Sequence, residues 1–353
     1  MWQGRELILC TLAFFAGNWL GDVLTFPPLV YLFLAFLSCG LAAVRPRMWL
    51  LLLCFAALGA AAVQLGRMPP LPGPTALSAW AGRCKAGFSA WLEAMLPPGD
   101  EQAVLRALAV GDRLALTRDL RAAYRDSGAM HLLALSGLHV GLIYALLVRL
   151  LAPLGGCRTL RILRSVLMLG LLWIYAVITG LSASISRAVL MITFYEISGL
   201  RSGDRDSLVA LFGSAFVLML FRPEVPRDIG FQLSYAAVLS ILLLHPRLSA
   251  LLRSRSRLLT RIWELLSVSL CCQATCGILA WFYFGTFPRY FLLTTLLAIP
   301  LATLVMYAIA ASVAASALAT LLGGIAGVAS TLRWLLHGLL HLLNTLIRLI
   351  ASL

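Results

Sequence analysis

A run of fourteen residues at 128–141, GAMHLLALSGLHVG, is apolar except for a few side chains that could do chemistry. These are His131, Ser136 and His139. A polar group in hydrocarbon must find a partner or line a water-filled cavity, so such residues are candidates for a functional site. If the run is helical, the three side chains share roughly a 140° arc at about 100° per residue. The pattern predicts a helix face turned to a polar lumen.

Small residues occupy the opposite side of the same helical projection, at Ala134, Gly137 and Gly141. Small side chains let the backbones of membrane helices approach closely, so this face is expected to pack against a neighbouring helix. Gly137 could instead break the helix and open its carbonyl groups to the lumen. The sequence leaves both arrangements open.

A second polar group is TGLSASISRAVLM, residues 179–191, in which Arg187 follows several serines. A fixed positive charge beside a serine-rich bend suits a phosphate. An interfacial arginine that reaches toward lipid headgroups is the alternative.

A third group lies in PEVPRDIGFQLSYAAVLSI, residues 223–241. Asp228, Gln232 and Tyr235 recur at i, i+4 and i+7 and therefore share one helix face. Asp228 also suits the positive end of the helix dipole. Gln232 and Tyr235 need partners in a membrane, and either contacts between helices or a pore lining would serve.

Enzymatic chemistry is not expected from these patterns. A hydrolase centred on Ser136 and His139 needs a base held by an orienting group, and no G-x-S-x-G surrounds the serine. The cysteines at 271, 272 and 276 lack metal-ligand spacing, and the sequence has no P-loop. We therefore predict no catalytic residue, no metal and no cofactor.

The composition predicts an all-α, polytopic integral membrane protein, because 61% of the 353 residues are hydrophobic and the mean hydropathy is +0.94. We expect ten or eleven transmembrane helices plus amphipathic interfacial helices. The expected spans are 6–21, 27–44, 48–65, 129–151, 163–181, 184–200, 207–221, 229–245, 263–284, 290–310 and 312–331. Residues 75–95 and 101–125 are expected to form a pair of interfacial or solvent-facing helices, and 333–353 an interfacial amphipathic helix.

The predicted organisation is a three-helix segment (1–65), an outer amphipathic region (66–128), a channel domain (129–331) and a C-terminal amphipathic helix (332–353). The net charge is +14, and nearly all of the positively charged side chains are arginines. These arginines concentrate in alternate short loops. Such a bias marks cytoplasmic loops, so we expect a cytoplasmic N-terminus and an outer location for 66–128.

Three segments in order resemble the competence membrane domain of ComEC-type DNA-internalization proteins. They are VGDRLALTRDLRAAYRDSGAMHLLALSGLHVGL (110–142), TGLSASISRAVLM (179–191) and RPEVPRDIGFQLSYAAVLSI (222–241). The family pattern is a Gly-Asp-Arg helix, a His-Leu-Leu-x-x-Ser-Gly-Leu-His span, a Ser-x-x-Arg-Ala helix and an Asp-x-Gly-Phe-Gln-Leu-Ser span. The resemblance covers roughly residues 100–315.

The resemblance implies an inner-membrane channel that admits single-stranded DNA during natural transformation. The family's motif residues fall on Asp112, Arg113, His131, Ser136, Gly137, His139, Arg187, Asp228, Gln232 and Ser234. We expect the strand, membrane lipid, a cytoplasmic motor and an outer DNA receptor as partners, with self-association left open. The longest family members also carry an oligonucleotide-binding-type outer domain and a metallo-β-lactamase-like domain. Neither is expected in these 353 residues, so nuclease activity is not expected either.

A transporter of another anionic or small polar solute is the main alternative, and an intramembrane hydrolase at Ser136 and His139 is a third. A DNA channel requires affinity for single strands that falls with salt and ignores base sequence.

Overall fold

The computed structural model describes residues 4–24, 26–44, 47–66, 76–155, 157–252, 256–285, 291–322 and 326–353. These residues form helices and connecting turns, with no β-strand among them. Seven of the described helices are long and apolar enough to cross a membrane, and three shorter helices are also apolar. The chain is therefore an all-α, multi-pass membrane protein, as its composition predicts.

The chain divides into two compact units, which are described separately. The first comprises Met1–Gly73 and Leu190–Leu242, and the second Pro74–Val189 and Leu243–Leu353. The predicted division into four segments stays a prediction.

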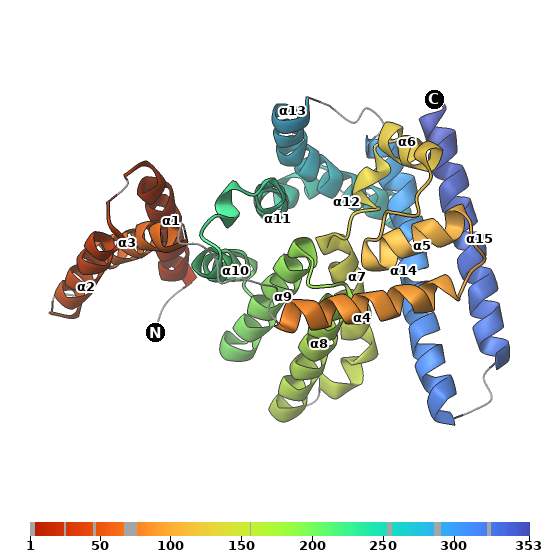
Figure 1. Ribbon diagram of the computed structural model, residues 1–353, viewed down its shortest axis with the longest axis horizontal. Helices are drawn as coiled ribbons and strands as arrows, with labels where there is room; N and C mark the ends of the chain where they lie inside the picture. Colours follow the sequence, from red (N-terminus) through yellow and green to blue (C-terminus); the bar gives the residue numbers. More distant parts are fainter. Residues whose placement is uncertain are drawn as a thin grey trace. The chain divides into compact units, whose positions relative to one another are not determined.

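The first unit contains α1 (Gly4–Val23), α2 (Pro28–Val44), α3 (Met48–Gly66) and α10 (Ser207–Phe221). Part of α11 (Ile229–Ser249) also belongs to it. These helices agree with the predicted spans to within a few residues. Figure 1 shows α1, α2 and α3 as one group near the start of the chain.

Glycines set the distance between α1 and α3. A Cβ built on Gly17 would lie 1.8 Å from the Ala56 carbonyl oxygen, and one on Gly59 would lie 2.1 Å from the Phe14 carbonyl oxygen. Neither position can hold a side chain without moving backbone. Asn18, buried on α1, donates a 2.8 Å hydrogen bond to the Pro223 carbonyl after α10.

The second unit contains α4 (Ala76–Glu93), α5 (Asp100–Val110), α6 (Arg118–Asp126), α7 (Gly137–Leu150) and α8 (Arg158–Ile178). It also holds the first part of α9 (Ala183–Ser202) and the end of α11. Further along are α12 (Arg257–Cys272), a π-helical turn (Gln273–Gly277), α13 (Ile278–Phe284), α14 (Phe291–Leu322) and α15 (Ala326–Ala351). Figure 1 shows α14 and α15 lying side by side.

Helix α5 forms much of the core of this unit, contrary to the predicted interfacial helix at 101–125. Every residue from Ala103 to Val110 except Arg106 is buried. Leu336, Leu340, Leu343 and Ile347 of α15 join the same cluster. The stretch also divides at Gly111, where the chain turns before α6 begins. Small and aliphatic residues all round a helix favour burial over an interface.

Polar contacts hold α5 and α6 against α15. Arg348 pairs with Asp100, and His341 Nδ1 lies 2.9 Å from a Glu101 carboxylate oxygen. The buried Tyr124 of α6 donates a 3.0 Å hydrogen bond to Asn344 Oδ1. These contacts, with the aliphatic stripe beneath them, place the end of α5 at a defined position in the unit.

One prediction at the C-terminal end is wrong. The spans expected at 290–310 and 312–331 include a single helix, α14, that runs from Phe291 to Leu322. The tail is helical, as predicted: α15 packs an aliphatic stripe into the core and is also long and apolar enough to cross a membrane, so its interfacial position stays a prediction. Because no charged residue separates the two predicted spans, composition alone could not locate the end of α14.

Replacing glycine by alanine at Gly17 and at Gly40 tests how closely α1 and α3 pack. Gly17→Ala should remove most folded protein from detergent extracts, because the new methyl group would overlap backbone atoms and cost about 3 kcal/mol or more. Gly40→Ala on α2 is the control, since a Cβ there meets nothing within 4 Å. The measurement is the monodisperse fraction and Tm after size-exclusion chromatography. Equal Tm values for both variants would contradict the close α1–α3 packing.

Candidate functional site

A tight turn after α5 organises the candidate site. Gly111 adopts φ +71°, and its amide donates a 3.0 Å hydrogen bond to the Ala107 carbonyl, which closes the helix. A Cβ at this position would lie 2.8 Å from Leu135 Cδ1. Glycine is therefore required here both by its conformation and by the side chain above it.

Asp112 is held in place from two sides. Its Oδ1 accepts a 3.0 Å hydrogen bond from the Leu114 amide, and its other oxygen pairs with Arg106, which also pairs with Glu93. Burial raises the pKa of Asp112, but the Leu114 amide and the Arg106 guanidinium outweigh it and hold the pKa below its ordinary value. The carboxylate is thus charged and committed to structural contacts.

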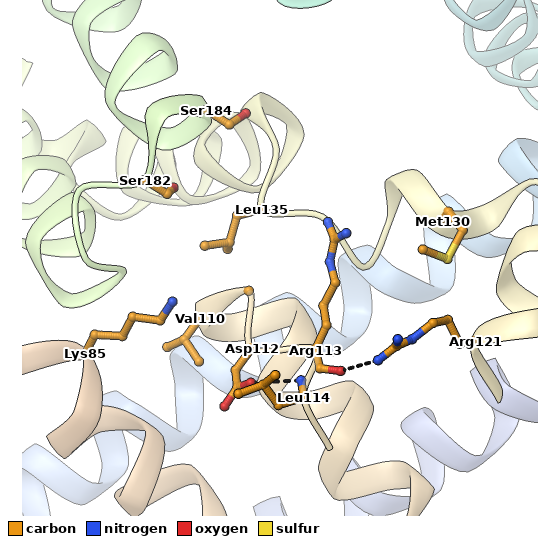
Figure 2. A pocket seen from close by; sticks show the side chains of 11 residues that line it. Lys85, Val110, Asp112, Arg113, Leu114, Arg121, Met130, Leu135, Ser182 and Ser184 are labelled. Carbon is orange, nitrogen blue, oxygen red and sulfur yellow. Dashed lines mark hydrogen bonds between the residues drawn. The ribbon is translucent and has the colours of Figure 1, made fainter. Parts of the chain in front are cut away.

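Arg113 links the turn to the segment that precedes α7. Its Nε donates a 3.1 Å hydrogen bond to the Leu133 carbonyl, and its own carbonyl accepts a 2.9 Å hydrogen bond from Arg121 of α6. Two of the motifs singled out from sequence, Gly-Asp-Arg and His-Leu-Leu-x-x-Ser-Gly, are therefore joined by a direct contact. The terminal nitrogens of Arg113 extend away from the turn (Figure 2).

A cavity of about 740 Å³ lies above this turn, within the size range of small-ligand sites. Gly111 contributes to the lining, and Figure 2 labels the other lining residues: Lys85, Val110, Asp112, Arg113, Leu114, Arg121, Met130, Leu135, Ser182 and Ser184. The lining contains more cationic side chains than acidic ones, and the acidic one, Asp112, already pairs with Arg106. The cavity therefore favours an anion.

The serine-rich bend forms another wall of the cavity. Gly180 has φ +75° and Leu181 has φ +53°. Residues other than glycine rarely adopt a positive φ. Ser182 follows, and its carbonyl accepts the Ser186 amide in the first turn of α9. The Ser182 hydroxyl oxygen is buried and has no hydrogen-bond partner in the part of the chain that the structure describes. Such a strained bend is a common feature of binding sites.

The bend faces cations other than the one predicted. Arg187 lies one turn further along α9, is only 8% exposed and is not part of the cavity lining. The cations that line the cavity together with Ser182 and Ser184 include Lys85 and Arg113. That the serines and a positive charge form one phosphate site stays a prediction.

The predicted span at 129–151 is wrong in its first part. Residues 129–131 form a single 3-10 turn, and α7 begins only at Gly137. His131 therefore does not share a helix face with His139, and its Nδ1 donates a 3.0 Å hydrogen bond to the Gly128 carbonyl. A continuous apolar run conceals this break in the sequence, although Gly137 is one of the places where the sequence allows a helix to be interrupted.

Ser136 and His139 cap the new helix start. The Ser136 amide donates to His139 Nδ1 at 3.2 Å, and the Ser136 hydroxyl oxygen lies 3.0 Å from the same nitrogen. The start of α7 is a capping box, in which the Ser136 side chain accepts from the His139 amide and the His139 side chain accepts from the Ser136 amide. Both side chains therefore satisfy backbone amides of the helix start, and a lining role for them stays a prediction. A Cβ on Gly137 would meet Ala188 Cβ at an ordinary 3.6 Å, and one on Gly141 would meet nothing within 4 Å, so the expected close-packed glycine face is not observed.

The remaining predicted residues belong to the first unit and have partners there. Asp228 Oδ1 accepts a 2.7 Å hydrogen bond from the Phe231 amide at the start of α11, as expected for a helix N-terminus. Gln232 donates to the Pro226 carbonyl at 2.9 Å, and Tyr235 lies 2.9 Å from the Ser214 hydroxyl of α10. Ser234 is partly exposed on α11. Contacts that fix helices account for these groups, and a lining role stays a prediction.

Sequence reasoning did not select Lys85, Arg121 or Leu135 as site residues, and it included Ser182 only within the serine-rich bend beside Arg187. Lys85 is the only lysine in the chain, which was the one available signal. It lies on α4, far from the Gly-Asp-Arg turn in sequence, so only the fold could bring them together.

Comparisons with known proteins place these observations in context. A family model described as "Competence protein" matches residues 108–353. This chain belongs to the competence protein family. The matched region includes the Gly-Asp-Arg turn, the segment before α7 and the serine bend, whereas Lys85 lies before it.

Two relatives with descriptive names are similar over part of the chain. ComE operon protein 3 of Bacillus subtilis (strain 168) is 39% identical over 149 residues, which cover 42% of this chain and 19% of that relative. Competence protein ComA of Neisseria gonorrhoeae is 30% identical over 144 residues, covering 39% and 21%. An uncharacterized protein of Aquifex aeolicus is 32% identical over 129 residues, covering 36% and 29%.

The matched part of this chain thus spans less than a third of the length of each of these relatives. No solved structure matches the chain.

The prediction for this site concerns the Arg106–Asp112 ion pair. Asp112→Asn should lower the free energy of unfolding by about 2 kcal/mol, because Arg106 loses a largely buried partner and the Leu114 amide a charged acceptor. Asp126→Asn is the control, since that carboxylate is 51% exposed and pairs with its neighbour Arg125, so its loss should cost less than about 1 kcal/mol. Thermal unfolding in detergent at neutral pH measures both.

Acid should remove the same contribution. Because the folded pKa of Asp112 lies below the unfolded value of about 3.9, its stabilisation is complete above that pH and is lost as the pH falls through the folded pKa. The difference in Tm between the wild type and Asp112→Asn should therefore shrink below about pH 4. A constant difference down to pH 3 would contradict the assignment.

Proposed function

We propose that this chain forms a channel that carries single-stranded DNA across the bacterial inner membrane during natural transformation. The observation that carries the proposal is the basic cavity, where separate segments of the competence region meet around Arg113 and the serine bend. The names of two relatives, a ComE operon protein and a competence protein, give further support.

The chemistry of the cavity suits a nucleic-acid backbone. Proteins that bind single strands without sequence preference combine a positive groove with surfaces that accept any base. Arg113 and Lys85 supply charge, while Val110, Leu114 and Leu135 supply an apolar surface. The described lining contains no aromatic side chain, so binding here would rest on phosphate contacts more than on base stacking.

The predicted topology gives the cavity a place in the path. A cytoplasmic N-terminus puts residues 66–128 on the outer face, and with them Lys85 and the Gly-Asp-Arg turn. The strand would meet this site as it arrives. An outer DNA receptor would deliver it, and a cytoplasmic motor would supply the driving force.

Transformation frequency tests the proposal. Deletion of the gene should abolish transformation in a competent host, and a plasmid copy should restore it. Arg113→Gln should lower the frequency at least tenfold, because it removes both a cation and the contact to Leu133. Arg118→Gln on α6 is the matched control: it removes the same charge from an exposed position outside the cavity and should transform as the wild type.

Unchanged transformation on deletion in a demonstrably competent host would overturn the proposal. Loss of uptake of a small anionic solute in the deletion strain, with transformation intact, would favour the solute transporter instead.

A further inference from the structure

We propose that Lys85 and Ser182 form a subsite for a backbone phosphodiester of the incoming strand. This inference rests on the proposed function and specifies which residues hold the substrate. The proposed ligand is the phosphate group and not a base, so recognition would be independent of sequence.

The position of Lys85 is fixed by the serine bend. Its side chain is half-buried, and a Cβ on Gly180 would lie 3.1 Å from Lys85 Cδ, so the lysine stem crosses directly over this glycine. Figure 2 shows the ammonium end of Lys85 on the Ser182 side of the cavity. Lysine presents a compact charge with rotatable donors, which suits a single phosphate.

Ser182 supplies an observation that points independently to a ligand. Its hydroxyl oxygen is buried in the cavity wall and has no hydrogen-bond partner among the described residues. Leaving such a group unsatisfied destabilises the folded protein. A phosphate oxygen within the cavity would accept the hydroxyl hydrogen and remove this cost.

The start of α9 adds to the same preference. Ser182 precedes the first residue of this helix, and its neighbour Ser184 also lines the cavity. The first amides of a helix carry partial positive charge and lack partners within the helix, so they attract an anion. The lysine, the hydroxyl and the helix start thus favour the same kind of ligand.

The other charged side chains have different tasks. Arg121 donates to the Arg113 carbonyl and is therefore a positioning residue for the turn. Asp112 pairs with Arg106, which offsets the carboxylate that would otherwise oppose an anion. Arg113 is fixed through Nε to Leu133, and its terminal nitrogens are directed into the cavity, as Figure 2 shows.

Selective protection of Lys85 tests the subsite on the unmodified protein. Because Lys85 is the only lysine, an amine-reactive ester can label only this residue and the N-terminal amine. Labelled peptides are quantified by mass spectrometry after brief exposure in detergent. Oligothymidylate should slow modification of Lys85 at least fivefold and leave the N-terminal amine unchanged.

A neutral-backbone oligothymidylate with methylphosphonate links is the matched ligand control and should not protect. Equal protection by both oligonucleotides would overturn the proposal, as would no protection by either. Phosphatidylglycerol also carries a phosphodiester. Protection by this lipid, with none by oligothymidylate, would assign the subsite to lipid and overturn the proposal for DNA.

Salt dependence gives a second, independent readout. The logarithm of the association constant for oligothymidylate should fall linearly with the logarithm of the salt concentration. Lys85→Gln should make this slope less steep by about 0.7, the value for one phosphate contact on a single strand. Arg83→Gln is the control, because it removes a charge from an exposed position on the same helix outside the cavity. Ser182→Ala should weaken binding about tenfold with no change in slope.

The failure of this inference can be told from failure of the proposed function. If deletion abolishes transformation but Lys85 is not protected and the slope is unchanged, the strand is held elsewhere in the chain. If deletion has no effect on transformation, DNA import itself is excluded whatever the cavity binds.

Discussion

The ion pair between Arg106 and Asp112 is the contact on which the candidate site depends. Arg106 is the one residue of the second half of α5 that is not fully buried, and it lies where the helix ends. Its charge fixes Asp112, whose other oxygen holds the Leu114 amide and so shapes the turn. In a largely apolar setting each charge needs the other, because removing one partner leaves the second buried and uncompensated.

From this turn the remaining contacts follow in sequence. Gly111 leaves space for Leu135, and Arg113 binds the Leu133 carbonyl, so the segment before α7 is positioned by the turn. The segment ends in the Ser136–His139 cap, from which α7 begins. A short loop thereby sets where an apolar helix starts, and the cavity above it gains its cations from α4, α6 and the turn itself.

The sequence predicted the parts of the fold that depend on local signals. Long apolar runs bounded by prolines, arginines or glycines gave α1, α2, α3 and α10 with correct limits. The start of α7 was missed because Leu132 and Leu133, buried in the core cluster, look in sequence like residues of a membrane span. The division of residues 290–331 was missed because no charged residue separates the two expected spans.

Only those parts of the candidate site that carry a local sequence motif could be predicted. Asp112, Arg113 and the serine bend carry motifs that can be recognised along the chain. Lys85 becomes significant only when α4 crosses the bend at Gly180, which is a tertiary contact. Ser136 and His139 of the opening motif form a capping box, because the amides at a helix end in an apolar region need hydrogen-bond partners.

The most direct measurement is photo-crosslinking during DNA uptake. Leu114 lines the cavity and is 91% exposed, so a photoreactive residue there should form a covalent bond to labelled transforming DNA. The same residue at Leu251, which is 74% exposed and outside the cavity lining, serves as the reference. A crosslink at 114 well above that at 251 is the predicted result. Successful import with equal or no crosslinking at the two positions would contradict a DNA path through this cavity.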